Sequence, residues 1–173
     1  MKKLNLPLTD EEISNLKAGE SLLLSGKVYT ARDAVHKILA ELIKNKRKPP
    51  IQIKGITIYY AGPTPTPPHR VIGSCGPTTS ARMDVFTPIL LKEGLKAMIG
   101  KGRRSREVKE AIKKYKAVYL LAPAGCGALL SKCVIRKRLI AYKELGPEAI
   151  YELEVRDFPV IVGMDSNGNS VYP

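Results

Sequence analysis

Apolar side chains recur at helical spacing in two segments of the chain. Residues 30–44 carry an apolar residue every three or four positions, with Thr30 placed to cap the amino terminus and Asp33 in the first turn. Residues 105–115 repeat this pattern behind Ser105, a second capping residue. The spacing predicts an amphipathic helix over each segment. Shorter helical patterns cover residues 9–19, 79–86, 88–92 and 125–133.

Near-continuous apolar runs predict strands between these helices. The runs are residues 22–30, 56–60, 97–99, 117–122, 135–142, 149–155 and 158–164, with a short strand from Leu4 before them. The first run is either one strand interrupted near Gly26 or a pair of strands. Four prolines between residues 62 and 68 favour an extended connector. Mixed strands and helices predict a layered α/β fold with a mixed sheet, in a single domain over residues 1–173.

The net charge of +13 arises from 29 Lys and Arg against 16 Asp and Glu, and it favours an anionic partner. The candidates are nucleic acid, a membrane surface, an acidic protein or a small anion. Basic runs occur at residues 44–48, 101–106 and 136–138, and the first and third are typical of solvated surfaces. Aromatic residues are not interleaved with these runs, which argues against stacking on nucleic acid. Binding of nucleic acid or phosphate stays an alternative.

Three cysteines, Cys75, Cys126 and Cys133, do not form a disulfide framework in number or spacing. They predict buried, reduced thiols and a cytoplasmic protein. Their spacing does not match a compact iron–sulfur site, and two histidines are too few for a metal site, so we expect no metal ligands in this chain. The amino terminus lacks the apolar core of a signal peptide, and no apolar run approaches the length of a membrane span.

The segment Gly76–Asp84, with sequence Gly-Pro-Thr-Thr-Ser-Ala-Arg-Met-Asp, gathers hydroxyls and an arginine at a predicted helix start. The hydroxyls of Thr78, Thr79 and Ser80, with the free amides of a helix amino terminus, are suited to binding an anion. Arg82 adds a bidentate contact for a carboxylate or phosphate. An ordinary helix cap with a surface arginine is equally compatible with this pattern.

Two further basic residues follow predicted strands. Arg32 lies at the start of the helix after residues 22–30, and His36, four positions on, shares its face. A cap followed by a solvated arginine is the plainer interpretation. Lys101 stands between two glycines after a strand, where open α/β sheets bind ligands, although a simple turn has the same sequence. The neighbours Arg103, Arg104 and Arg106 are expected on the outside of the next helix.

No pair of carboxylates and no Ser/His/Asp order accompanies these cations. The chain therefore offers contacts for anions without an evident base. This asymmetry indicates a partner chain that completes the site. A non-catalytic assembly subunit is the alternative.

Five segments in chain order carry a likeness to a known family. They are Gly26–His36, Tyr60–Pro63, Gly73–Asp84, Ile99–Gly102 and Glu152–Pro159. They resemble the class I fumarase family, as the beta subunit or C-terminal domain of iron–sulfur hydro-lyases that act on fumarate or tartrate. The likeness runs from about residue 22 to the end of the chain, and the Gly-Pro-Thr-Thr-Ser-x-Arg-Met-Asp block is its most specific part.

The resemblance implies a swivelling β/β/α fold and the reversible hydration of fumarate to L-malate. It implies a hetero-oligomer, for example α2β2, whose alpha subunit carries a [4Fe–4S] cluster that this chain does not ligate. Arg32, Thr78, Thr79, Arg82 and Lys101 would bind the dicarboxylate, with Thr78 and Lys101 in catalytic roles. Dehydration of L-tartrate with the same contacts is the close alternative.

Overall fold

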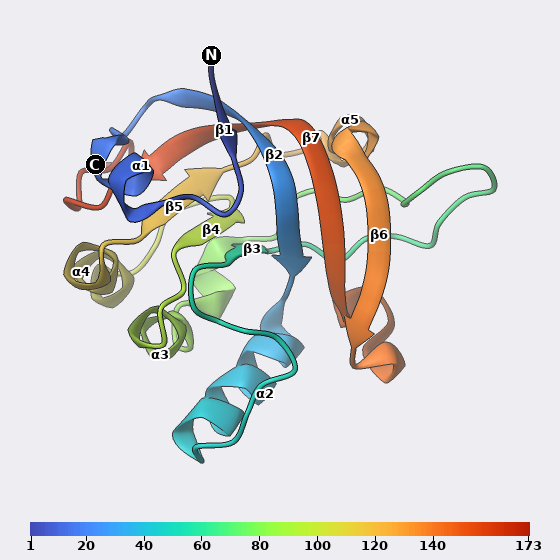
Figure 1. Cartoon of the computed structure of the whole chain (residues 1–173), viewed down its shortest axis with the longest axis horizontal. Helices are drawn as coiled ribbons and strands as arrows, with labels where there is room; N and C mark the ends of the chain where they lie inside the picture. The colour runs from blue at the N-terminus through green and yellow to red at the C-terminus, as the bar shows by residue number, and fades with distance from the viewer.

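The computed structural model describes residues 1–173, in which strands and helices are mixed along the chain (Figure 1). The strands are β1 (Lys2–Asn5), β2 (Ser21–Thr30), β3 (Thr57–Tyr59), β4 (Ala97–Gly100), β5 (Val118–Leu121), β6 (Val134–Ala141) and β7 (Ile150–Met164). The α-helices are α1 (Asp10–Asn15), α2 (Asp33–Lys44), α3 (Thr87–Lys92), α4 (Arg106–Tyr115) and α5 (Gly127–Leu130). Short 3-10 helices are η1 (Ser80–Met83), η2 (Ser131–Cys133) and η3 (Lys143–Glu148).

One seven-stranded sheet runs in the order β1-β2-β3-β4-β5-β7-β6. Strands β1 to β5 are parallel neighbours, whereas β7 pairs antiparallel with β5 and β6. Strand β7 also pairs with β2, from Ser21–Ile161 to Tyr29–Glu152, and this pairing closes the sheet into a small barrel. The predicted α/β fold with a mixed sheet is confirmed. Because β2, β3, β4 and β5 are parallel, their carboxyl ends lie along one rim.

Alternating side chains of the central strands pack into two separate cores. Tyr59 and Ile99 pack inside the barrel with apolar residues of β2, β5 and β7. Their chain neighbours Ile58 and Met98 pack on the other face, with apolar residues of α2, α3 and α4. These three helices lie below the sheet in Figure 1. Burial on both faces explains why these strands are nearly continuous apolar runs.

The carboxyl-terminal segment differs from the prediction of two strands, because residues 150–164 form the single strand β7. Asp157 has a positive φ of 48°, and β2 is irregular opposite it between Leu24 and Gly26. The backbone N–H of Asp157 donates to Ser25 Oγ at 3.0 Å, which anchors the bulge. The bulge breaks the alternation of side chains, so the sequence resembles the end of one strand and the start of another. Strand β2 is likewise one strand with an irregularity.

Thr30 does not cap α2, contrary to the prediction. Strand β2 continues through Thr30, which pairs with Tyr59 of β3. Its hydroxyl donates to the carbonyl of Ala149 at 3.2 Å and accepts from the N–H of Tyr151 at 3.0 Å. The sheet thus uses Thr30 to join β2 to the start of β7. Arg32 takes the cap position without a side-chain hydrogen bond, and α2 begins one residue later.

Ser105 caps α4 as predicted, since its Oγ accepts from the N–H of Val108 at 3.2 Å. The helix predicted over residues 79–86 is wrong, because only the four residues of η1 are helical there. Ser80 explains the difference: its N–H donates to the carbonyl of Lys101 at 3.0 Å, so the backbone entering η1 is held by β4. No helix of the chain combines the length and the apolar character needed to cross a membrane.

Candidate active site

The parallel strands deliver two of the predicted site residues to one place. Arg32 follows β2 and Lys101 follows β4, and β3 lies between these strands. Because parallel strands end on the same side of a sheet, the residues that follow them are neighbours. We call this edge, formed by the ends of β2, β3 and β4, the carboxyl rim. It is where both residues lie.

The segment Gly76–Arg82 lies against this rim and carries the other predicted residues; we call it the crossing segment. The N–H of Thr78 donates to the carbonyl of Tyr60 at 2.6 Å, beyond the end of β3. The N–H of Ser80 donates to the carbonyl of Lys101, beyond the end of β4. These two amides are therefore engaged, and the predicted use of a free helix amino terminus for an anion is wrong for them. The threonine hydroxyls and the cationic side chains remain.

Gly100, at the end of β4, lets the crossing segment lie close to the rim. A Cβ added to Gly100 would lie 2.0 Å from Oγ of Ser80 and 2.8 Å from Cδ2 of Tyr60, far below any tolerated contact. A Cβ added to Gly76 would lie 3.3 Å from Cα of Gly127, a tight contact that a small shift relieves. The crossing segment thus depends on glycine at the end of β4.

Asp33 pairs with Arg82 and is the chain neighbour of Arg32. Its Oδ2 accepts from Nη2 of Arg82 in an ion pair. Arg82 keeps a side-chain exposure of 53%, so it also faces solvent. Arg32 lies over Gly62, where an added Cβ would be 3.0 Å from its Cδ and Nη1, and its Nε is buried without a partner. A buried N–H without an acceptor is costly, so Arg32 is suited to receive an anion.

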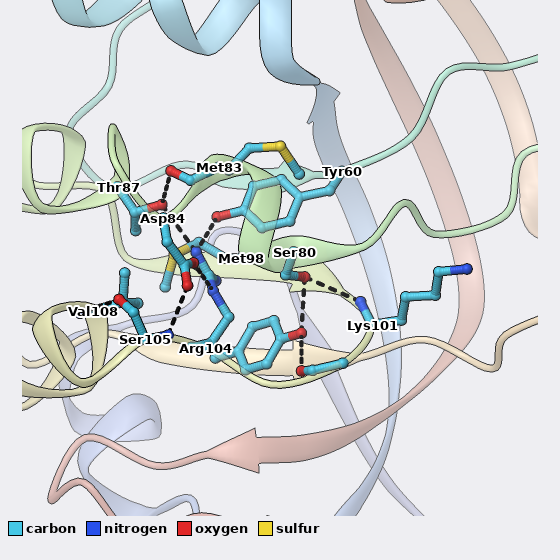
Figure 2. Close-up of polar contacts among 12 residues, drawn as sticks. Tyr60, Ser80, Met83, Asp84, Thr87, Met98, Lys101, Arg104, Ser105 and Val108 are labelled. Carbon is cyan, nitrogen blue, oxygen red and sulfur yellow. Dashed lines mark hydrogen bonds and ion pairs between the residues drawn. The ribbon is translucent and has the colours of Figure 1, made fainter.

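The rim is open to solvent. Thr79 is exposed, and Thr78 and Lys101 are partly exposed. The Lys101 side chain points away from the buried polar residues that surround its backbone (Figure 2). The predicted residues Arg32, Arg82, Lys101, Thr78 and Thr79 therefore lie along the same rim of the sheet. Water screens charges on an open surface, so the rim would bind a small anion more strongly once another surface covered it.

Arg104 is the residue that the sequence pattern misplaced. It was expected outside the helix, yet its side chain has no exposed surface. Its Nε donates to Oδ1 of Asp84 at 2.7 Å (Figure 2). Its guanidinium lies 5.2 and 4.8 Å from the ring centroids of Tyr60 and Tyr119. Arg104 precedes the first residue of α4, so helical periodicity does not apply to it. The available signal was Asp84, since a carboxylate in an apolar setting requires a cation.

His36 supports the site from the buried face of α2. Its Nδ1 lies 2.9 Å from the carbonyl oxygen of Arg32 and, because a carbonyl only accepts, carries the proton. The ring packs edge-on against Tyr60, with centroids 5.2 Å apart. Burial lowers the pKa of His36 to about 4, so it is uncharged at neutral pH. His36 therefore holds the backbone at Arg32 and adds no charge to the rim.

The cysteines of this chain do not fit an iron–sulfur cluster. All three are free thiols, and no group of three or more His, Cys, Asp or Glu side chains is gathered to hold a metal ion. Burial raises the pKa of Cys75 to about 12 and also raises the pKa of Cys133. Both thiols are therefore protonated at neutral pH. The chemistry of the rim rests on its arginines, lysine and threonines.

The fold and the site define a mixed α/β chain whose cations gather at one rim of a closed sheet. The chain belongs to the Fumarase C-terminus family, whose sequence model matches residues 1–173. The family expected from the sequence motifs is confirmed.

Individual relatives differ in how much of their own length this chain matches. A protein of Methanocaldococcus jannaschii, named as a candidate beta subunit of L(+)-tartrate dehydratase, is 43% identical over 171 residues, covering 95% of this chain and 88% of its own. The anaerobic class I fumarate hydratase of Escherichia coli is 38% identical over 173 residues, covering 98% of this chain and 32% of its own. Fumarate hydratase 2 of Leishmania major is 37% identical over 164 residues, which cover 94% of this chain and 29% of the length of that relative. The chain thus spans most of the first relative and about a third of the other two.

Proposed function

We propose that this chain is the beta subunit of an iron–sulfur-dependent hydro-lyase that interconverts fumarate and L-malate. The cationic rim carries the proposal: Arg32 and Lys101 follow neighbouring strands there, and the crossing segment with Thr78, Thr79 and Arg82 is bonded to it. A dicarboxylate needs a cationic contact at each end, and the rim offers three cations. Membership of the Fumarase C-terminus family and the names of the relatives support the same reaction.

The rim would act mainly by stabilising charge. Dehydration of malate removes a proton from the carbon beside one carboxylate and expels hydroxide from the adjacent carbon. As the proton leaves, negative charge grows on that carboxylate, and cations already in place stabilise it more than they stabilise the substrate. Asp33 orients Arg82, and the crossing segment holds the backbone of Lys101. Arg82 is therefore oriented before the reaction, and the backbone position from which Lys101 extends is fixed.

Thr78 is the proposed acceptor of that proton. A threonine hydroxyl is too weak a base on its own, so a carboxylate or imidazole of another chain must activate it. The [4Fe–4S] cluster is likewise proposed on that chain, an alpha subunit, because the cysteines described above do not fit it. With a separate alpha subunit, this half-site would be completed in a hetero-oligomer, for example α2β2.

The name of one relative supports a separate alpha subunit. The fumarate hydratases contain this chain as about a third of their length, whereas the relative of similar length is named as a subunit. We infer that residues 1–173 form one domain whose open rim is covered by that subunit. The cytoplasm is the proposed compartment, on the basis of the uneven number of cysteines.

Dehydration of L-tartrate is the second candidate, favoured by the name of the 43%-identical relative. Tartrate carries one hydroxyl more than malate and the same two carboxylates. The rim would bind both through the same cations. Side chains of the alpha subunit would then decide between the two substrates.

The test is anaerobic co-expression with an iron–sulfur alpha chain, followed by ultraviolet assay of fumarate loss and tartrate dehydration. We expect activity only when both chains are present, and the faster substrate identifies the enzyme.

Arg82→Gln should lower kcat/KM at least about tenfold through the loss of a charged contact. Arg47→Gln is the matched control, because it changes an exposed arginine that is distant in sequence from the crossing segment. It should leave kcat/KM unchanged. Activity from this chain alone would refute the half-site. Salt-dependent DNA binding with no dicarboxylate turnover would favour the nucleic-acid alternative.

A further inference from the structure

The backbone of Lys101 is enclosed by hydrogen bonds to a single residue. Its N–H donates to Oγ of Ser80 at 3.1 Å, and its carbonyl accepts from the N–H of Ser80 at 3.0 Å. Ser80 is fully buried and lies close to Gly100, where an added Cβ would be 2.0 Å from its Oγ. The Lys101 side chain points away from these bonds (Figure 2). The two peptides that flank Lys101 are therefore held, and with them the direction in which its side chain leaves the backbone.

Tyr119 of β5 extends these bonds into a directed chain. Its hydroxyl oxygen lies 2.8 Å from Oγ of Ser80 and 2.9 Å from the carbonyl oxygen of Gly102. Burial raises the pKa of the hydroxyl, so it keeps its single proton. Because the carbonyl only accepts, both contacts are satisfied when Tyr119 donates to Gly102 and Ser80 donates to Tyr119. The chain runs from the N–H of Lys101 through Ser80 and Tyr119 to Gly102.

Arg104 fixes the ring that carries this hydroxyl. Its guanidinium lies 4.8 Å from the ring centroid of Tyr119, and its Nη2 donates to the hydroxyls of Tyr60 at 3.3 Å and Thr87 at 2.9 Å. The ion pair with Asp84 anchors the guanidinium itself (Figure 2). Arg104 and its ion pair with Asp84 thus keep the hydroxyl of Tyr119 in place beside residues 101 and 102.

We propose that Tyr119 and Ser80 are positioning residues that fix the direction from which Lys101 meets a substrate carboxylate. Lys101 is followed by Gly102, whose φ is 82°, and a lysine beside such a glycine would swing freely if its peptides were not bonded. A cation held in one direction binds and stabilises a carboxylate better than one that samples many. This role rests on the proposed function, because there Lys101 is assigned to the substrate.

The test is a double-mutant cycle in the complex with the alpha chain. Tyr119→Phe removes the hydroxyl and keeps the ring, and Lys101→Ala removes the ammonium group. We expect Tyr119→Phe to lower kcat/KM for fumarate about tenfold when Lys101 is present, which corresponds to one hydrogen bond. In the Lys101→Ala background it should cause no further loss. If it lowers kcat/KM by the same factor in both backgrounds, its role is structural and the proposal fails.

Tyr59→Phe is the matched control. Tyr59 is also fully buried, and its hydroxyl donates to the backbone carbonyl of Cys75 at 2.6 Å. Any effect of this variant on kcat/KM should be the same with and without Lys101. Ser80→Ala repeats the cycle if Tyr119→Phe does not fold, with the same two outcomes.

Amide hydrogen exchange of the isolated chain separates this inference from the proposed function. Tyr119→Phe should speed exchange at the Lys101 amide and leave the amides of β2 unchanged. Unchanged protection at Lys101 would overturn the positioning role whatever the enzyme does. A wild-type complex with no activity on fumarate or tartrate would instead refute the proposed function, and the role of Tyr119 in substrate binding would fall with it.

Discussion

Single residues of the rim differ in whether the chain itself neutralises them. Arg104 is buried against Asp84, and Arg82 is paired with Asp33 while facing solvent. Arg32 has a buried Nε that no group of the chain accepts. A buried cation needs a partner, so the Arg104–Asp84 pair is structural. The unpaired Nε of Arg32 instead supports the contact with an anion that we propose for it.

Thr78→Ala tests the assignment of the proton acceptor. We expect kcat in the complex to fall about a hundredfold or more, the usual contribution of a general base, with little change in KM. Thr79→Ala, its exposed neighbour, should change KM more than kcat, because it is assigned only to binding. Steady-state kinetics on fumarate measures both. An unchanged kcat for Thr78→Ala would remove Thr78 from the chemistry.

The stability of the chain should depend on pH through His36. Its folded pKa of about 4 lies below its ordinary value of 6.5, so the unfolded chain takes up the proton first as pH falls. Stability is then complete above pH 6.5 and declines by roughly 3 kcal/mol towards pH 4. His36→Phe should remove this part of the decline in urea denaturation at stepped pH. Parallel curves for wild type and variant would show that His36 is not buried as a neutral ring.

Among elements, Asp84 joins the end of η1 to the start of α4. Its Oδ1 accepts from Arg104, and its Oδ2 accepts from the N–H of Ser105 at 2.6 Å. The residue that ends the Gly76–Asp84 motif thus orders the helix behind the rim. The motif is therefore structural at its carboxyl end and is proposed to bind substrate in its middle.

Two alanine variants at the start of α4 separate the ion pair from the helix cap. Asp84→Ala leaves the guanidinium of Arg104 buried without its carboxylate and should destabilise the chain by about 3–5 kcal/mol. Ser105→Ala removes only the cap and should cost about 1 kcal/mol. Urea denaturation of the isolated chain compares them. Equal losses would mean that Arg104 finds another partner when Asp84 is absent.

Over the whole molecule, local sequence patterns predicted most helices and strands but did not predict that the sheet closes into a barrel. Apolar runs and the cap at Ser105 depend on residues a few positions apart, so periodicity reveals them. Closure pairs Ser21 with Ile161 and depends on bulges near Gly26 and Asp157. A bulge interrupts the alternation of side chains on which the prediction of a strand rests. Which strand pairs with a given edge depends on the whole sheet and cannot be derived from the sequence of either strand alone.

The candidate site divides in the same way. Arg32 and Lys101 follow the ends of strands, and strand ends are local features that the sequence indicates. The setting of Arg104 depends on Tyr60 and Tyr119 meeting across neighbouring strands, which only the assembled sheet determines. Thr30 was misassigned for the same reason, because its hydroxyl serves a strand that begins far along the chain.

Closure also predicts where the molecule is most stable. Strand β2 pairs with β7 along most of its length and with β1 and β3 on its other side, whereas β6 is an edge strand with Arg136 and Leu139 exposed. We expect amides of residues 22–29 to exchange only through global unfolding, and those of β6 to exchange more than about tenfold faster through local opening. Exchange followed by NMR at two protein concentrations measures this. If the amides of β6 were as protected as those of residues 22–29 and lost this protection on dilution, β6 would be covered by self-association. If they were as protected at both concentrations, the assignment of β6 as the edge of the sheet would be contradicted.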